Sequence, residues 1–185
     1  MGERKGQQNR PYSRYQLDDM ETGMALTRWL TALALSGILM TGPAAAALAL
    51  CSQPHHAKSR HHDGRADYRR FRAAAEHGNA AAQNQLGVLF NRGRGVPQDY
   101  IEAVRWWHLS ADRGNAIAQC NLGIMYSYGQ GVKQDEVLAH MWFNLAAARG
   151  SREARKRRDN IATWRMSHKQ VLEAQLLAAE FEAEH

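Results

Sequence analysis

Residues 79–114 read NAAAQNQLGVLFNRGRGVPQDYIEAVRWWHLSADRG, and residues 115–150 read NAIAQCNLGIMYSYGQGVKQDEVLAHMWFNLAAARG. The two stretches align without a gap, and 17 of their 36 positions are identical. Self-similarity at a fixed period of this length is the signature of a repeat protein, in which one supersecondary unit stacks on the next.

The first half of each repeat predicts a helix with one apolar face. Asn79 and Asn115 stand where an N-cap is wanted, just before an alanine-rich stretch. Gly87 and Gly123 fall mid-helix, where glycine costs about 1 kcal/mol relative to alanine. A cost repeated at the same place predicts close approach of a neighbouring helix. The apolar face is expected at helical spacing on Ala82, Leu86 and Phe90, and on Ala118, Leu122 and Tyr126.

A tight turn and a second helix fill the rest of each repeat. The Gly-x-Gly sequences at 93–95 and 129–131 supply the positive φ angles of the turn. Asp99 and Asp135 cap the second helix, and Glu102 is expected to complete a capping box in the first repeat.

The inner face of the second helix is expected to be aromatic and apolar. Trp106 and Trp142 occupy equivalent positions on it, and Gly114 and Gly150 end the two helices. These tryptophans and Trp107 could stack on sugars or bases, but their spacing favours a role in the core. The expected inner face is Ala103, Trp106 and Leu109, with Ala139, Trp142 and Leu145.

The repeat pattern runs past both ends. Residues 66–78 match the second helix of a repeat and form a leading half repeat. Residues 151–185 contain two capping helices, over 152–164 and from Ser167, where Ser167 and Gln170 form a capping box. The total is about seven helices between residues 66 and 185.

The pattern A-x-x-x-L-G-x-x-[FY]-x-x-G-x-G-V-x-x-D-x-x-x-A-x-x-W-x-x-x-A-x-x-x-G resembles the Sel-one-like repeat, a short relative of the tetratricopeptide repeat. The resemblance covers residues 66–150. It implies an all-α fold, a right-handed α/α superhelical solenoid that acts as an adaptor or scaffold, commonly in exported bacterial proteins.

An uncharged apolar stretch, WLTALALSGILMTGPAAAALALC, occupies residues 29–51 and follows Arg28. A positive flank, an apolar core and small residues are the parts of a secretory signal, and residues 47–49 offer a small-x-small cleavage site. The stretch is also long enough, at about 23 residues, to span a bilayer.

Residues 1–50 are therefore a polar leader with a cleaved signal or a retained anchor. The leader is long for a signal, so either Met20 or Met24 is the true start or the segment is an anchor. Lipid attachment at Cys51 is a third option, because residues 48–51 loosely resemble a lipobox. Each option exports the rest of the chain, which is expected in the periplasm or anchored to the cytoplasmic membrane facing it.

Residues 51–65 read as a polar linker with the histidine pairs 55–56 and 61–62. Such tracts sometimes bind zinc or copper, but a flexible tract offers no preorganised geometry, and no metal or cofactor is expected. Cys51 and Cys120 could pair in the mature chain. Nothing in their spacing argues for a disulfide, so we expect packing to hold the fold.

Catalytic motifs are absent from the sequence: it has no His-Glu-x-x-His, Gly-x-Ser-x-Gly or Ser-x-x-Lys. Some cysteine-rich exported members of the resembled family are linked to penicillin binding or β-lactam hydrolysis, and they pair cysteines within each repeat. This sequence has only Cys120 in its repeats. The alternative of an envelope enzyme of β-lactam or peptidoglycan processing is therefore not favoured, and we expect no enzyme.

The charge is unevenly placed, with 24 Lys+Arg against 18 Asp+Glu. The run at residues 155–158 could meet phosphate or anionic lipid, which leaves a membrane or nucleic-acid binder as a third hypothesis. Such a run is more often the solvated face of a helix, so no nucleic acid is expected.

The favoured function is a non-catalytic protein–protein interaction scaffold in the bacterial envelope. In tetratricopeptide-like solenoids, first-helix residues that face away from the second helix line a concave binding groove. Mixed polar and apolar side chains there suggest an extended peptide or a partner helix. The expected groove residues are Asn84, Val88, Asn91, Arg92, Cys120, Ile124, Ser127 and Tyr128.

Overall fold

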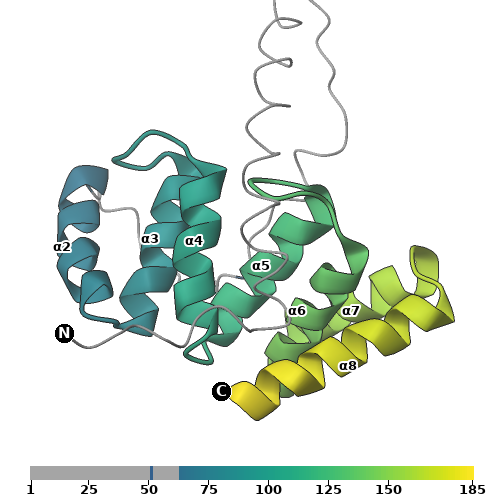
Figure 1. The fold of residues 1–185 in the computed structure, drawn as a ribbon. Coiled ribbons are helices and arrows are strands. Elements are labelled where there is room, and N and C mark those ends of the chain that lie inside the picture. Colours follow the sequence, from purple (N-terminus) through teal and green to yellow (C-terminus); the bar gives the residue numbers. More distant parts are fainter. Residues whose placement is uncertain (1–50, 52–62) are drawn as a thin grey trace, which may run out of the picture.

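The computed structural model describes residue 51 and residues 63–185. This part of the chain forms seven helices and no strand (Figure 1), which confirms the predicted all-α fold. The helices are α2 (Gly64–Glu76), α3 (Ala80–Arg92), α4 (Tyr100–Ala111), α5 (Ala116–Tyr128), α6 (Glu136–Ala148), α7 (Arg152–Trp164) and α8 (His168–Glu184).

The helix starts follow from the polar side chains that precede them. Asn79 and Asn115 accept hydrogen bonds from backbone N–H groups at the starts of α3 and α5, as predicted. Ser151 does the same for α7, 36 residues after Asn115. Because the cap recurs at the repeat period, α7 is the first helix of a third unit.

One predicted cap is wrong. Asp99 caps α4 through its side chain, but Glu102 does not complete a capping box. The carboxylate of Glu102 pairs with Arg105 at 2.6 Å, and the Asp99 backbone N–H donates to the carbonyl of Phe90. The predicted box at Ser167 and Gln170 is present at the start of α8.

The interhelix turns have the backbone that the Gly-x-Gly sequences predict. Gly93 and Gly95 adopt φ angles of 63° and 76°, and Gly129 and Gly131 adopt 67° and 68°. Side chains are disfavoured at these angles.

The mid-helix glycines admit an aromatic ring from the second helix of the same repeat. A Cβ on Gly87 would lie 2.5 Å from Nε1 of Trp107, and a Cβ on Gly123 would lie 2.6 Å from Cδ1 of Phe143. Trp107 and Phe143 occupy equivalent repeat positions. The predicted close approach at both glycines is confirmed.

The predicted inner face of the second helix needs a correction. Trp107 is fully buried in α4, whereas Trp106 is half-buried at the edge of the core. Leu109 is 41% exposed, although its repeat equivalent Leu145 is 1% exposed. Helices α7 and α8 both pack on α6 and bury the face of α6 that carries Leu145.

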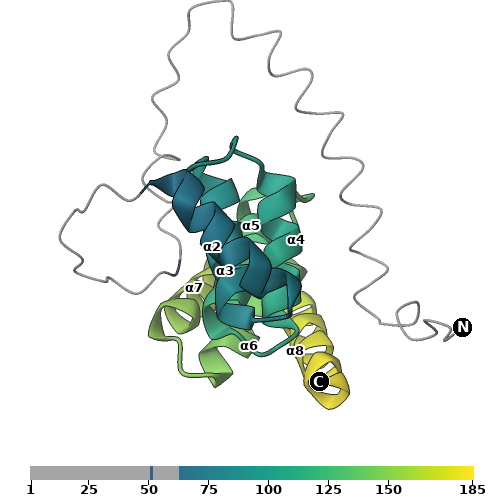
Figure 2. The ribbon, with the colours of Figure 1, turned by 90° about the vertical axis from the view of Figure 1, so that its left-hand side faces the viewer.

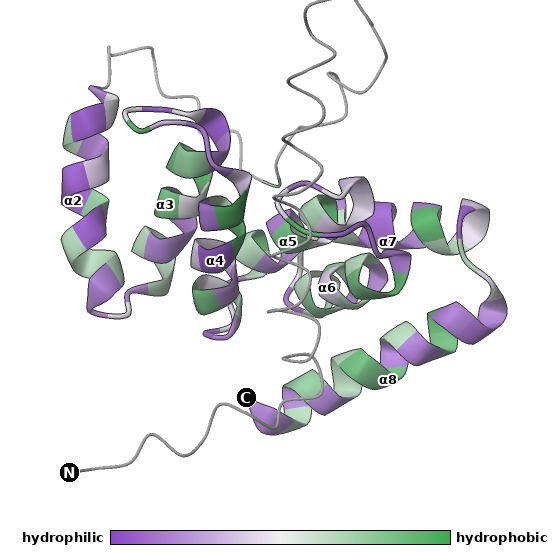
Figure 3. Cartoon of the chain, turned by 45° about the horizontal axis from the view of Figure 1, so that its top comes forward, coloured by the Kyte–Doolittle hydropathy of each residue, from purple (hydrophilic) through white to green (hydrophobic). Residues whose placement is uncertain are grey.

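Successive helices pack on one another from α2 to α7, and α8 then departs from this order. It packs on α6 rather than on α7, so it crosses the end of the solenoid (Figures 1 and 2). The most buried helices, α5 and α6, carry many of the hydrophobic residues, whereas α2 at the outer end is largely polar (Figure 3).

The apolar stretch at 29–50, its cleavage site and the two histidine pairs lie outside the described residues. Among the described helices, none is both long enough and apolar enough to cross a membrane.

Candidate functional site

The eight residues expected in the groove separate into two groups. Asn84, Asn91, Cys120, Ile124 and Ser127 are buried, which the expectation of an open groove along both first helices did not anticipate. Val88 is half-buried, and Arg92 and Tyr128 are exposed, Tyr128 by 42%. Binding of a partner at these positions stays a prediction.

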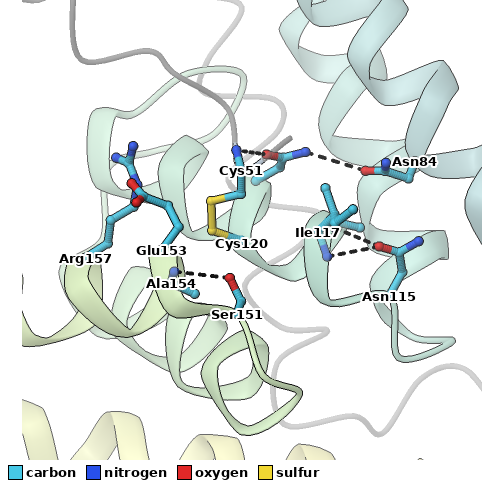
Figure 4. Close-up of a disulfide and its surroundings, with 11 residues drawn as sticks. Cys51, Asn84, Asn115, Ile117, Cys120, Ser151, Glu153, Ala154 and Arg157 are labelled. Atoms are coloured by element: carbon cyan, nitrogen blue, oxygen red, sulfur yellow. Dashed lines mark hydrogen bonds and ion pairs between the residues drawn. A yellow bond between two sulfur atoms is a disulfide. The ribbon is translucent and has the colours of Figure 1, made fainter. Parts of the chain in front are cut away.

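A disulfide bond covers the part of the expected groove that contains Asn84 and Cys120. Cys51 and Cys120 are bonded, with their Cα atoms 5.8 Å apart. The Cys51 backbone N–H donates to Oδ1 of Asn121 at 3.0 Å, and the Asn121 amide donates to Oδ1 of Asn84 at 3.5 Å (Figure 4). The expectation that packing alone holds the fold is therefore wrong, because a covalent bond fastens residue 51 to α5.

An open pocket of about 330 Å³ lies between the end of α5 and α7. Ser127 and Tyr128 line the α5 side, so two of the eight expected residues belong to it. Buried Phe143 and Ile161 contribute its apolar surface. The remaining lining residues, from α7 and the residue after it, are Glu153, Lys156, Arg157, Asn160 and Arg165.

Several of the polar side chains of this pocket are held in place by hydrogen bonds and ion pairs. Arg165 donates to the hydroxyl of Ser127 at 3.1 Å and to its carbonyl at 3.4 Å, and it also pairs with Glu136. Arg157 pairs with Glu153 at 2.9 Å, one turn earlier on α7. Three cations and one carboxylate thus line the pocket.

Two of those cations come from the basic run at 155–158 that the sequence offered as an alternative surface. Lys156 and Arg157 line the pocket. Arg158 instead pairs with Asp159 and donates to Asn144. Arg165 and Asn160 were missed, because their place beside Ser127 depends on how α7 packs, which the repeat pattern does not encode.

Two histidines of the second helices pack against core residues: His140 is buried, and His108 is half-buried. His108 lies 3.4 Å from the Tyr126 hydroxyl and makes edge contacts with the rings of Tyr126 and Trp142. Burial lowers the pKa of His108 to about 3, so it is neutral near pH 7. Burial, and then the charge of Arg158, lowers the pKa of His140 to about 4.

Comparisons with known proteins find other proteins built from the same kind of helical repeat. The chain is similar to c5321, described as a protective antigen present in uropathogenic Escherichia coli strains displaying an SLR fold, at 34% identity and a TM-score of 0.59. That match covers 63% of this chain and 25% of the other, so the chain spans about a quarter of its length.

A Sel1 repeat protein from Oxalobacter formigenes is also similar, at 41% identity and a TM-score of 0.49, over 50% of this chain and 69% of that one. No curated protein matches the chain. The family model described as the Sel1 repeat matches residues 80–115 and 116–151. These residues are therefore two consecutive Sel1 repeats, and through them the chain belongs to the Sel1 repeat family, the family that its sequence resembles.

Proposed function

We propose that the chain is a non-catalytic scaffold of the bacterial envelope that binds a partner protein on the side lined by the first helices α3, α5 and α7. Sel1 repeats generally mediate protein–protein interaction. Solenoids of this kind bind partners on an extended surface formed by equivalent helices of successive repeats.

The pocket between α5 and α7 is the observation that carries this proposal. It lies between the first helices of consecutive units, where such a partner is expected, and it is open to solvent. The neighbouring stretch between α3 and α5 is closed by Cys51. The proposed partner site is therefore the α5–α7 end rather than the whole row of expected groove residues.

The disulfide supports export. Structural disulfides form and persist in oxidising compartments such as the periplasm. Cleavage after Ala49 leaves Cys51 in the mature chain, and so does a retained anchor. Lipid attachment would occupy the sulfur that bonds to Cys120, so we favour a cleaved signal or an anchor over a lipoprotein.

The test is capture of a partner by the full chain in its native envelope. The chain with a C-terminal tag is crosslinked in intact cells and purified, and its adducts are identified by mass spectrometry. We expect a defined envelope protein, and no turnover of a chromogenic β-lactam or of peptidoglycan by the purified chain. Reproducible turnover that disappears on substitution of a pocket residue would replace the scaffold with the enzyme alternative.

A further inference from the structure

We propose that the α5–α7 pocket recognises carboxylates of an acidic peptide segment in the partner protein. This inference rests on the proposed function and adds the chemistry of the partner. The pocket is defined here by Lys156, Arg157, Arg165, Asn160, Ser127 and Tyr128.

The charges at the pocket favour an anion. Lys156 is exposed, and no hydrogen bond or ion pair holds its ammonium group within the described part of the chain. Arg165 is fixed from behind by Ser127 and Glu136, and 37% of its side chain stays accessible. The terminal nitrogens of Arg165 already donate to Ser127 and pair with Glu136, so Arg165 adds positive charge beside Lys156, and the Lys156 ammonium is the group that would bind the carboxylate.

The rest of the lining favours a peptide over a phosphate-rich surface. Glu153 lies in the same pocket and disfavours a ligand with densely spaced negative charges such as a row of phosphates, although its pair with Arg157 partly offsets its own charge. Asn160 and the Tyr128 hydroxyl can bond to peptide amides. Phe143 and Ile161 offer apolar contact for side-chain methylenes.

An exposed tryptophan extends this surface along α7. Trp164 is 79% exposed, and it follows Lys156 and Asn160 at intervals of four residues, which places all three on one face of the helix. Large aromatic side chains are enriched among the residues that dominate protein interfaces. The fitting segment is therefore one that pairs acidic residues with a neighbouring apolar or aromatic residue.

The experiment measures fluorescence anisotropy of a labelled glutamate-rich peptide with the full oxidised chain, against the matched glutamine peptide. We expect saturable binding of the glutamate peptide alone. Lys156→Glu should weaken it by about tenfold or more, while Lys156→Arg retains it. Arg155→Glu is the matched control, because Arg155 neighbours Lys156 on α7 and lies outside the pocket. Circular dichroism and melting temperature confirm folding of each variant.

Equal loss in the Arg155→Glu and Lys156→Glu variants would overturn the proposal, because binding would then follow net charge rather than the pocket. Binding of anionic vesicles or RNA in preference to the peptide would overturn it in favour of those ligands. If crosslinking in the envelope identifies a protein partner but the acidic peptide does not bind, the proposed scaffold function is retained and the proposed recognition of carboxylates is rejected. If crosslinking finds no partner and the acidic peptide does not bind, both the proposed function and the proposed carboxylate recognition are rejected.

Discussion

At the scale of single residues, the core of each repeat is set by a glycine and the ring that lies on it. Gly87 faces Trp107, and Gly123 faces Phe143, at the same position of successive repeats. The ring occupies the space that a side chain on the first helix would fill, so the two helices of each repeat pack closely. The loss of helix propensity at glycine is offset by this contact.

Gly123→Ala should therefore destabilise the protein, although alanine is the better helix former by about 1 kcal/mol. The new Cβ would meet the Phe143 ring at 2.6 Å, and overpacking of a core typically costs about 1–3 kcal/mol. Denaturant unfolding measures the change. The same substitution in a Phe143→Leu background should cost less, because the ring is gone; stabilisation by Gly123→Ala in the parent chain would contradict this account.

Two histidines that pack against the core, His108 and His140, make the stability depend on pH. Unfolded histidine titrates near 6.5, whereas burial lowers the pKa of His108 to about 3 and that of His140 to about 4 in the folded chain. Between these values the unfolded chain binds protons that the folded chain does not. The free energy of unfolding should therefore be retained above pH 6.5 and fall from there toward pH 4, by up to about 1.4 kcal/mol per pH unit for each histidine.

Urea unfolding at several pH values from 7 to 5 measures this slope, in a range above the titration of ordinary carboxylates. His108→Phe should flatten the slope, because the ring packs between Tyr126 and Trp142 without a titrating group. An unchanged slope in that variant would show that His108 accepts a proton in the folded state.

At the scale of elements, α8 decides which aromatic residues of the second helices are buried. Phe181 of α8 packs edge-on against Trp142, with ring centroids 5.2 Å apart. Trp106 occupies the same repeat position on α4 and stays half-buried. Equal positions in the repeat therefore do not make equal contributions to the core.

Trp107→Ala and Trp142→Ala should each lower the free energy of unfolding by about 3–5 kcal/mol, as truncations of large buried aromatics do. Trp106→Ala should cost clearly less, because its side chain is partly in water already. Denaturant unfolding of the three variants checks the order. A Trp106→Ala variant as unstable as the other two would mean that α4 buries the wider face that the repeat alignment predicts.

The repeat pattern was sufficient to predict the helices, their turns and most of their caps, because these depend on local residues such as Asn115, Gly129 and Ser167. It was insufficient wherever a residue depends on a distant partner. The burial of Leu145 but not Leu109 follows from the packing of α7 and α8 on α6. Cys120 is buried and bonded to Cys51, which lies 69 residues away in the sequence. A repeat pattern does not predict a contact of this kind.

At the scale of the whole molecule, the disulfide fastens the segment at residue 51 to the middle of the solenoid. It closes a long loop, since its cysteines are 69 residues apart, and it leaves the α5–α7 pocket open. The same fold thus has one stretch of its first-helix side occupied by its own chain and another available to a partner.

Removal of this bond by Cys51→Ser should lower the free energy of unfolding by about 2–4 kcal/mol, because the unfolded chain regains the freedom of the loop. The comparison is made by denaturant unfolding of the parent and variant, each with and without reductant. Reductant should destabilise the parent and leave the variant unchanged. A parent chain that is insensitive to reductant would show that the bond does not form.

The most direct test of the central claim, that the α5–α7 side binds a partner protein, is site-specific photocrosslinking in the native envelope. A photoreactive residue replaces Tyr128 at the pocket or Leu176, which is 66% exposed on α8 and lies outside the pocket. The account predicts a discrete protein adduct from position 128, lost with Lys156→Glu, and none from position 176. An adduct from position 176 with none from position 128 would contradict it.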